Sequence, residues 1–302
     1  MSDLVVLVGP TASGKTALGA TLAERIGGEV VSADAFAVYR GLDIGTAKPD
    51  RALRARVPHH LVDVADPGSR YSAGMFVREA DAAIAEIRRR GRVPLVVGGT
   101  HFYVRALLYG LFPEPPKDER LRAQLELEWK RDAGDVRKRL EEIDRVAAAR
   151  ILPNDRQRIL RALEVCLVSG KPLTELWDEH RRVDARYAFV MLGLNPPRAA
   201  LHATIELRVE RMFSAGLLHE VGGLLAGGLS PRAHALKAIG YRESCRVLAG
   251  ELTIPQAVQK ATEATRQLAK RQMTWLRAES ALHWLTGQVD EMLAQASARV
   301  EV

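Results

Sequence analysis

The chain has 302 residues, of which 47% are hydrophobic and 27% are charged, a balance typical of a globular protein with one large or two modest domains. Its 44 Lys and Arg residues outnumber its 37 Asp and Glu residues, and the net charge of +7 permits attraction to polyanions without proving it. Two isolated cysteines argue against structural zinc or disulfides, and the lack of apolar runs near the roughly 18 residues of a membrane span predicts a cytoplasmic protein.

The first predicted strand, Leu4–Val8, runs directly into a glycine-rich loop that precedes a predicted helix at 17–26. The loop fits the P-loop pattern G-x-x-x-x-G-K-T, which ATP-binding and other nucleotide-binding proteins share, and consists of Gly9, Pro10, Thr11, Ala12, Ser13, Gly14, Lys15 and Thr16. Glycines let backbone N–H groups close around a polyphosphate, and the helix N-terminus points at the same anion. We therefore predict a phosphate site in which Lys15 supplies positive charge and Thr16 a hydroxyl ligand for Mg²⁺.

Short apolar runs alternate with helical patterns in the next hundred residues, which predicts a parallel sheet flanked by helices. These runs are 29–31, 60–64 and 93–97. Ligands of such sheets lie beyond the carboxyl ends of the strands, so Asp34 and Thr100, each just past a strand, are candidate site residues. Each also has a structural alternative, since either residue can cap a turn or a helix, and a helix is predicted at 101–109.

The composition changes near residues 113–116, which read Pro-Glu-Pro-Pro. From there, residues 114–186 are dense in charges of both signs and show helical periodicity with almost no strand signal. A strand returns at 187–194, and the remainder is mostly helical. We therefore predict an α/β, P-loop NTPase-like parallel-sheet core formed by residues 1–113 and 187–302, with 114–186 as an inserted all-helical domain.

A late predicted helix, residues 261–277, separates apolar from basic side chains. A helical wheel predicts an apolar stripe of Ala261, Ala264, Leu268 and Trp275, and a nearly opposite basic stripe of Arg266, Lys270 and Arg277. This pattern fits a core helix with a solvated face, and it also fits a face that follows nucleic-acid phosphates.

Longer motifs carry a family resemblance. They are residues 32–34 (Ser-Ala-Asp), 39–49 (Tyr-Arg-Gly-Leu-Asp-Ile-Gly-Thr-Ala-Lys-Pro), 57–61, 98–100 (Gly-Gly-Thr), 154–165, 238–242 and 269–272. Together with the P-loop, they make the chain resemble the bacterial tRNA dimethylallyltransferases, also called tRNA isopentenyltransferases, over nearly its whole length. The resemblance implies transfer of a dimethylallyl group from dimethylallyl diphosphate to N6 of the adenosine immediately 3′ of the anticodon.

The chemistry of that reaction agrees with the residues present. The exocyclic amine of adenine is a poor nucleophile because its lone pair is delocalised, so a base must accept its proton, and Asp34 is the candidate. The resemblance implies that Thr100 hydrogen-bonds to the departing oxygen and that Arg208 holds the diphosphate. Charge on the leaving group would be stabilised by the loop N–H groups, by Lys15 and by Mg²⁺ on Thr16.

The resemblance also implies contacts with the tRNA anticodon stem-loop. The corresponding residues here are Asp34, Ala35, Phe36, Ala37, Thr100, Arg122, Gln157, Arg158, Ile159, Leu160, Arg161, Lys237, Gly240, Tyr241 and Arg242. A loop base must be unstacked and drawn into a pocket, which requires cations along the backbone and close packing. For each arginine a surface salt bridge is the alternative. We expect a monomer whose partners are this RNA and dimethylallyl diphosphate.

The sequence departs from the family pattern at two places. Ala35 stands where the family commonly carries a serine, so a side-chain contact with the target base is in doubt there, and Phe36 and Ala37 are also unusual. His101 follows Thr100 where a small or apolar residue is more usual, and we interpret it as a packing or surface histidine rather than a catalytic one.

Three other functions fit part of the pattern. A P-loop kinase for a small metabolite would use the same loop, Mg²⁺ and an aspartate base, and would turn over ATP. A prenyltransferase acting on free adenine nucleotides would leave the arginines predicted to face RNA without a role. A nucleic-acid-stimulated ATPase or simple RNA-binding module fits less well, because the strand at 93–97 runs into Gly-Gly-Thr rather than into an acidic Walker B pair.

Overall fold

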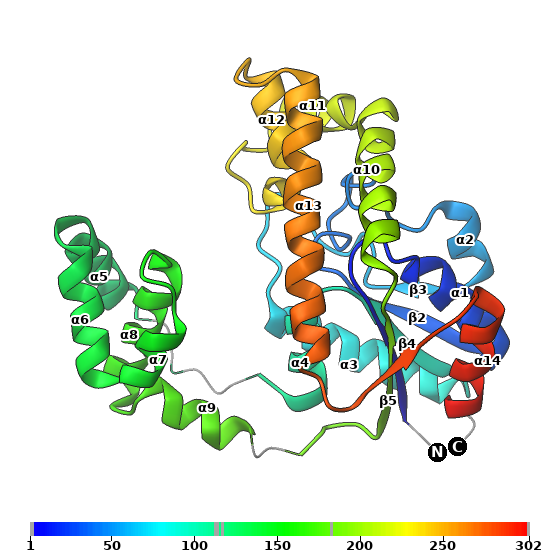
Figure 1. Cartoon of the computed structure of the whole chain (residues 1–302), viewed down its shortest axis with the longest axis horizontal. Coiled ribbons are helices and arrows are strands. Elements are labelled where there is room, and N and C mark those ends of the chain that lie inside the picture. Colours follow the sequence, from blue (N-terminus) through cyan, green and yellow to red (C-terminus); the bar gives the residue numbers. More distant parts are fainter. Residues whose placement is uncertain (1–2, 112–114, 116–117, 182–183, 301–302) are drawn as a thin grey trace. The chain divides into compact units, whose positions relative to one another are not determined.

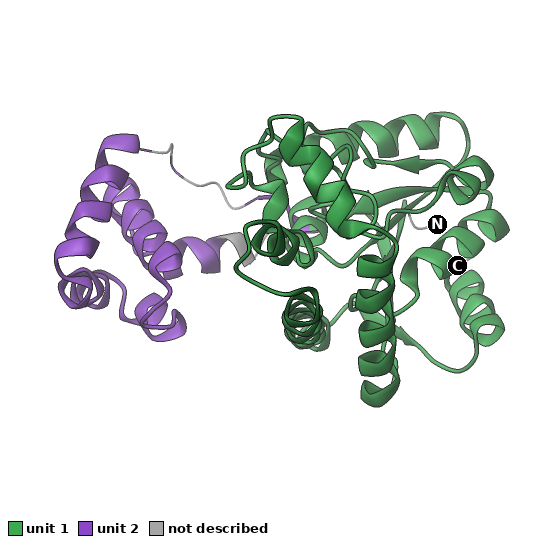
Figure 2. Cartoon of the chain, turned by 90° about the horizontal axis from the view of Figure 1, so that it is seen from above, with its two compact units in different colours: residues 1–108, 186–302 green, residues 109–185 purple. Residues whose placement is uncertain are grey.

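The computed structural model describes residues 3–111, 115, 118–181 and 184–300. The chain divides into two compact units, Met1–Leu108 with Arg186–Val302 as unit 1 and Tyr109–Ala185 as unit 2 (Figure 2). The predicted boundary between residues 113 and 114 lies outside the described residues. No helix in the described part of the chain has the length and apolar character that crossing a membrane requires.

Unit 1 contains a six-stranded sheet in the order β3-β2-β4-β1-β5-β6, and all neighbouring strands are parallel. The strands are β1 (Leu4–Val8), β2 (Gly28–Ala33), β3 (His59–His60), β4 (Val93–Gly98), β5 (Phe189–Leu194) and β6 (Leu282–Leu285). All residues of β1 are buried between β4 and β5, which explains why this strand reads as a continuous apolar run. The predicted parallel α/β fold is confirmed.

Helices cover both faces of the sheet (Figure 1). They include α1 (Lys15–Ile26), α2 (Arg51–Arg56), α3 (Ala73–Arg89), α4 (His101–Tyr109) and α14 (Val289–Val300). On one face, Leu22 of α1 and Leu293 of α14 share a core cluster with Val5 and Leu7 of β1. The connections β1 to β2 and β3 to β4 run in opposite directions along the sheet, so right-handed crossovers place α3 on the other face.

Two strands differ from the prediction. The run 60–64 contributes only the short β3, because Leu61 and Asp63 have φ angles of 60° and 61°, in the left-handed region that a strand cannot include. The edge strand β6 is not predicted. Its four residues follow a long helical segment, and so short an apolar run does not distinguish a strand from a helical turn.

Five further elements of unit 1 lie beyond the carboxyl ends of the strands (Figure 1). They are α10 (Arg198–Ser214), α11 (Leu217–Ala226), the 3₁₀ turn η1 (Ala235–Lys237), α12 (Tyr241–Leu248) and α13 (Ile254–Arg277). Ile205 of α10 packs with Ala261 and Ala269 of α13, and Ala12 of the P-loop joins this cluster. The packing therefore ties both long helices to the loop.

The buried face of α13 differs from the predicted stripe. Its buried residues near the C-terminal end are Ala269, Gln272, Met273 and Leu276. Trp275 lies outside this face and is 56% exposed, so its predicted place in the core is wrong. The wheel alone could not show which edge of the apolar stripe is covered, because that depends on α10 and the sheet edge.

Unit 2 consists of helices joined by loops, and no strand lies among its described residues. It contains α5 (Glu119–Arg131), α6 (Ala133–Ile143), α7 (Arg145–Arg150), α8 (Arg156–Ser169) and α9 (Leu173–Arg181). An aspartate side chain accepts backbone N–H groups at the start of each of the first four helices, namely Asp118, Asp132, Asp144 and Asp155. Its apolar core includes Leu140, Ile159, Leu163 and Cys166.

Candidate functional site

The glycine-rich loop between β1 and α1 has the geometry that an anion site needs. A Cβ at Gly9 would lie 2.8 Å from Ser13 Oγ, so the close turn requires glycine. Ala12 and Gly14 adopt positive φ angles of 64° and 82°. Gly14 is the N-cap of α1 and no side chain caps the helix, so the first N–H groups of α1 are open to an anion.

The loop between β4 and α4 lies directly beside the P-loop. A Cβ at Gly99 would lie 2.6 Å from Gln272 Nε2 and 3.4 Å from Lys15 Nζ, so this residue must be small. The next residue, Thr100, accepts a hydrogen bond from Ala35 N at its Oγ1, with a distance of 3.0 Å. The hydroxyl hydrogen of Thr100 remains available for a ligand, and the ends of β1, β2 and β4 meet at one site.

Gln272 of α13 connects these two loops. Its Oε1 accepts a hydrogen bond from Thr11 N at 2.8 Å, and its Nε2 donates to Gly99 O at 2.8 Å. The side chain is buried. Sequence reasoning did not assign Gln272 to the site, although an amide side chain on the buried face of an amphipathic helix is a signal for a buried polar connection.

Two cations lie at this edge, and neither has a carboxylate partner in hydrogen-bond contact among the described residues. Within the described part of the chain, Lys15 Nζ donates only to Pro10 O, at 3.2 Å. Burial lowers the pKa of Lys15 to about 8, with Asp34 opposing the shift and Arg208 adding to it. Arg208 of α10 forms no hydrogen bond or ion pair with the described residues. Burial lowers the pKa of Arg208 and Asp34 partly restores it. Desolvated cations without close partners are costly, so this pocket is suited to an anion.

Asp34, the sequence-predicted base, follows β2 and forms a local turn. Its Oδ1 accepts hydrogen bonds from Phe36 N at 2.8 Å and Ala37 N at 3.1 Å. Its Oδ2 has no hydrogen-bond partner among the described residues. Asp34 can therefore both cap the turn and act as a base, because the turn fixes Oδ1 and leaves Oδ2 open.

The residues present fit a divalent cation held together with phosphates. Among the described residues, no group of three or more His, Cys, Asp or Glu side chains could hold a metal ion by itself. Thr16 lies at the start of α1, and its side chain makes no hydrogen bond with any described residue. A cation bound by one hydroxyl, phosphate oxygens and water has the coordination that Mg²⁺ prefers.

Two of the predicted RNA-contacting regions lie side by side in unit 1. The ring of Phe36 stacks on His234 with centroids 6.1 Å apart and planes 16° apart. Burial lowers the pKa of His234, and the positive charge of Lys237 lowers it further. Lys237 itself is exposed at the end of η1. The structure therefore brings the segment after Asp34 next to the segment that precedes α12.

Tyr241 is not a surface residue. Its side chain is fully buried, and its hydroxyl donates to Glu220 Oε1 at 2.5 Å and accepts from Gly45 N at 3.1 Å. Glu220 also accepts from the backbone N–H groups of Asp43 and Ile44. The predicted RNA contact of the Tyr241 side chain is therefore corrected to a support of segment 43–45, which this buried network holds in place.

Gly240 and Arg242 flank Tyr241 and differ from it. Gly240 has a φ angle of 91° and its N–H donates to the buried carboxylate of Glu243 at 2.7 Å. Arg242 is exposed and pairs with the same carboxylate. The cationic side chain is thus both anchored and accessible.

Two of the residues predicted on α8 face the interior of unit 2. Ile159 and Leu160 lie in its apolar core, so RNA contacts through these side chains are excluded and only their backbone could take part. Gln157 and Arg158 in the first turn are exposed, and Arg158 lies 3.4 Å from Asp155. Burial therefore divides the predicted contacts into core and surface residues.

Arg122 and Arg161 converge on one carboxylate. Arg122 Nη2 lies 3.0 Å and Arg161 Nη1 2.8 Å from Glu164 Oε2, and Glu164 is only 1% exposed. A buried carboxylate needs such partners. The salt-bridge alternative thus holds for both arginines, and it also fixes where their side chains lie.

His101 is a packing residue in this structure. Neither ring nitrogen has a hydrogen-bond partner in the described residues, and burial lowers the pKa of His101 to about 4. The ring is therefore neutral at pH 7.

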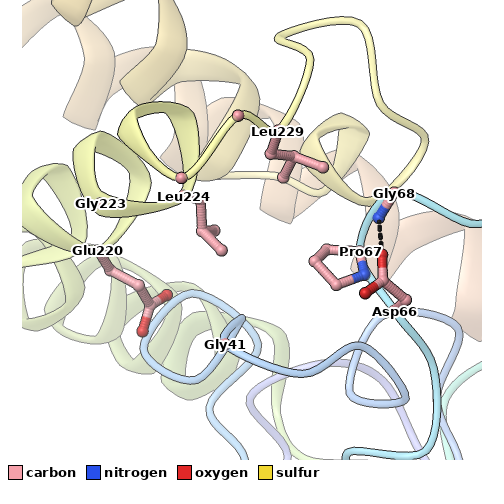
Figure 3. A pocket seen from close by; sticks show the side chains of 10 residues that line it. Gly41, Asp66, Pro67, Gly68, Glu220, Gly223, Leu224 and Leu229 are labelled. Carbon is pink, nitrogen blue, oxygen red and sulfur yellow. Dashed lines mark hydrogen bonds between the residues drawn. The ribbon is translucent and has the colours of Figure 1, made fainter.

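A cavity of about 500 Å³ lies elsewhere in unit 1, between α11 and the segment 66–68 (Figure 3). Its lining includes the carboxylates of Asp66 and Glu220. Asp66 Oδ1 accepts from Gly68 N at 2.8 Å, and Glu220 is committed to the network around Tyr241. None of the residues predicted for catalysis lines this cavity.

Comparisons with known proteins match the whole site region. A family model described as IPP transferase matches residues 37–279, and one described as isopentenyl transferase matches residues 2–56. The chain is 48% identical over 285 residues to the tRNA dimethylallyltransferase of Geobacter sulfurreducens, covering 94% of this chain and 92% of that protein. The chain belongs to the tRNA dimethylallyltransferase family.

Other members of this family agree in sequence and structure. The tRNA dimethylallyltransferase of Anaeromyxobacter dehalogenans is 49% identical over 296 residues, 97% of this chain and 98% of that protein. The crystal structure of the Bacillus halodurans tRNA isopentenylpyrophosphate transferase is similar with a TM-score of 0.74 and 35% identity, covering 100% of this chain and 96% of that chain. The crystal structure of a eukaryotic dimethylallyltransferase acting on tRNA is similar with a TM-score of 0.80 and 27% identity, covering 98% of this chain and 77% of that chain.

Proposed function

We propose that the protein transfers a dimethylallyl group from dimethylallyl diphosphate to N6 of the adenosine immediately 3′ of the anticodon in tRNA, with Mg²⁺ as cofactor. One observation carries the proposal: two desolvated cations, Lys15 and Arg208, lie with open P-loop N–H groups around Asp34, whose Oδ2 is free. Relatives named tRNA dimethylallyltransferase support the choice of substrates, and they favour prenyl transfer over the kinase and ATPase alternatives.

The leaving group is bound by residues 9–16 together with Arg208. When the allylic C1–O bond breaks, its electron pair passes to the diphosphate oxygen, and Lys15 and the loop N–H groups stabilise the negative charge that grows there. The Thr100 hydroxyl, oriented by its bond from Ala35 N, donates a hydrogen bond to the departing oxygen. The Thr16 hydroxyl would hold Mg²⁺, which would supply Lewis-acid stabilisation of the same charge.

The acceptor loses a proton as it reacts. The N6 amine forms the new bond to C1, and Asp34 Oδ2 accepts the N6 proton. The two backbone hydrogen bonds to Oδ1 hold the carboxylate in one orientation, so its free oxygen is positioned before the substrate arrives. The products are dimethylallylated adenosine, diphosphate and a protonated Asp34 that returns its proton to solvent.

RNA binding involves residues of both units. In unit 1 we propose the segment 34–37 with Lys237 and Arg242, and in unit 2 we propose Arg122, Arg161, Gln157 and Arg158. Glu164 holds the side chains of Arg122 and Arg161 in place through ion pairs. Cations of this kind bind the phosphate backbone and make binding depend on salt.

The decisive experiment offers two acceptors to the purified protein with Mg²⁺ and radiolabelled dimethylallyl diphosphate. One is an unmodified anticodon stem-loop with adenosine 3′ of the anticodon, and the other is AMP. Label in the RNA alone supports the proposal, and a stem-loop with guanosine at that position should remain unlabelled. Label in AMP alone would indicate a nucleotide prenyltransferase, and no label with either acceptor would contradict prenyl transfer.

A further inference from the structure

The turn that carries Asp34 is anchored at both of its ends. At its start, Ala35 N donates a hydrogen bond to Thr100 Oγ1 at 3.0 Å, which ties the turn to the loop after β4. At its end, the side chain of Tyr39 is fully buried. Between these anchors, the N–H group of Phe36 donates to Asp34 Oδ1 at 2.8 Å. The middle of the turn therefore sets the direction in which the carboxylate points.

His234, which precedes η1, contacts this turn at two points. Its ring stacks on Phe36, with centroids 6.1 Å apart and planes 16° apart, and its Nδ1 lies 3.3 Å from the hydroxyl oxygen of Tyr39. The two contacted residues are also joined to each other, because Tyr39 N donates to Phe36 O at 3.1 Å. One side chain, 195 residues from Tyr39 in the chain, thus supports both the middle and the end of the turn.

The hydroxyl group of Tyr39 needs His234 as its acceptor. The hydroxyl oxygen already accepts a hydrogen bond from Tyr71 N at 3.1 Å, so its own hydrogen has to point to another group. Among the described residues, His234 Nδ1 is the acceptor within reach. A buried hydroxyl without an acceptor is costly, and the hydrogen bond therefore selects the neutral imidazole with its proton on Nε2.

The surroundings of His234 favour this neutral form. Burial lowers the pKa of His234, and the positive charges of Lys237 and Arg70 lower it further. A protonated ring would carry N–H groups on both nitrogens and could not accept a hydrogen bond from Tyr39. The imidazole therefore keeps its acceptor at pH 7.

We propose that His234 is a positioning residue for the transfer reaction, which holds the turn 34–37 so that the free Oδ2 of Asp34 faces the N6 amine of the target adenosine. Its contacts are with Phe36 and Tyr39, so it acts on Asp34 only through the turn. This inference rests on the proposed function, which makes Asp34 the base. A base that lies slightly out of line with the proton it must accept lowers the rate of the chemical step.

The first test compares His234→Ala and His234→Asn with wild type in single-turnover transfer assays, with the anticodon stem-loop and dimethylallyl diphosphate both saturating. His234→Ala removes the ring and the acceptor, and we expect the rate constant to fall about 10- to 100-fold. His234→Asn places an amide oxygen near the position of Nδ1, so it should be faster than His234→Ala. The Kd for the stem-loop, from fluorescence anisotropy, and the KM for dimethylallyl diphosphate should stay within about twofold of wild type.

A double-mutant cycle tests whether His234 acts through the base. In an Asp34→Asn background no carboxylate remains to be positioned, so adding His234→Ala should lower the residual rate by less than about twofold. A residue that supports the fold in general would lower the rate by the same factor in both backgrounds, and that result would overturn the inference.

A second histidine provides a matched control. His219 is exposed on α11, and His219→Ala should change neither the rate constant nor the Kd for the stem-loop. Thermal melting of each variant checks that it is folded. His234→Asn keeps the test available if His234→Ala is not folded.

The outcomes separate this inference from the proposed function. If wild type labels the stem-loop and His234→Ala does so at the wild-type rate, the inference is overturned and the proposed function stands. If His234→Ala weakens stem-loop binding but leaves the rate at saturation unchanged, the imidazole contacts RNA instead of positioning Asp34, and the inference is again overturned. If wild type fails to label RNA, the proposed function itself fails.

Discussion

The chemistry of the site depends on single groups whose environment differs from bulk water. Lys15 is half-buried and has only a carbonyl oxygen as hydrogen-bond partner among the described residues, and Arg208 is desolvated beside it. Asp34 contributes one oxygen to a turn and keeps the other open. These residues are arranged for a ligand rather than for one another, which is typical of sites where function costs stability.

Replacing Asp34 by Asn should separate the two roles of this residue. The amide oxygen can still accept from Phe36 N and Ala37 N, so the turn is retained, but the side chain can no longer take a proton. We expect turnover to fall about 10²- to 10⁴-fold, with RNA affinity within twofold of wild type. Single-turnover transfer assays and anisotropy check this, and unchanged turnover would remove Asp34 from the mechanism.

The lowered pKa of Lys15 predicts how the free energy of unfolding depends on pH. Its folded pKa of about 8 is below the ordinary 10.5, so the unfolded chain binds this proton more tightly than the folded protein does. The charged form therefore costs stability below pH 8, and the cost is relieved as pH rises from 8 to 10.5. Lys15→Met should raise the free energy of unfolding at pH 7 by about 1–3 kcal/mol and abolish transfer.

Urea denaturation of the ligand-free protein at pH 7 and pH 9.5 measures this effect. The gain from Lys15→Met should shrink at the higher pH, because the wild-type lysine is then largely neutral. A variant less stable than wild type at pH 7 would show that the Lys15 charge is compensated in the folded protein.

At the scale of elements, α13 connects parts of the site that are far apart in the chain. Its inner face reaches the P-loop and the loop after β4 through Gln272, and it packs on α10, which carries Arg208. The helix thereby fixes the two strand-end loops relative to each other. Buried polar connections of this kind are costly when only one partner remains.

Gln272→Ala should leave Thr11 N and Gly99 O without their partner and loosen both loops. We expect KM for dimethylallyl diphosphate to rise and kcat to fall, together about 10- to 100-fold in kcat/KM for an effect of about 1–3 kcal/mol. KM for RNA should remain the same, which a general loss of folded protein would not produce selectively. Steady-state kinetics with each substrate varied in turn measure the difference, and equal effects on both KM values would contradict this role.

At the scale of the whole molecule, the two compact units differ in the residues that they contribute. Unit 1 contains every residue proposed for chemistry, while unit 2 contributes a helical surface whose arginines have different degrees of burial. Arg161 and Arg122 hold the buried Glu164, whereas Arg158 is exposed. RNA affinity and the stability of unit 2 should therefore respond to different arginines.

A pair of substitutions checks this division. Arg161→Ala leaves Glu164 with fewer cationic contacts and should destabilise the protein by about 1–3 kcal/mol. Arg158→Ala should change stability by no more than about 0.5 kcal/mol but weaken RNA binding and reduce its salt slope by about 1. Thermal melting and anisotropy at several salt concentrations measure both, and the reverse pattern would show that Arg158 is structural.

Local sequence determined much of this protein by itself. The P-loop at 9–16 and the strand ends carrying Asp34 and Thr100 were predictable because glycine spacing and strand-end position act over a few residues. The parallel sheet was predictable from apolar runs alternating with helical patterns. The helical character of residues 118–181 follows in the same way from periodicity and from the aspartates that begin four of its helices.

Only the tertiary structure decided which side chains face inward and which remain free. Trp275 and Tyr241 are both aromatic residues on helices, yet one is exposed and the other fully buried, because burial depends on what packs against each helix. Gln272 could enter the site only once α13 was folded back onto loops more than 170 residues away in the chain. Periodicity reports a helix's own faces, and contacts between distant segments decide which of those faces are covered.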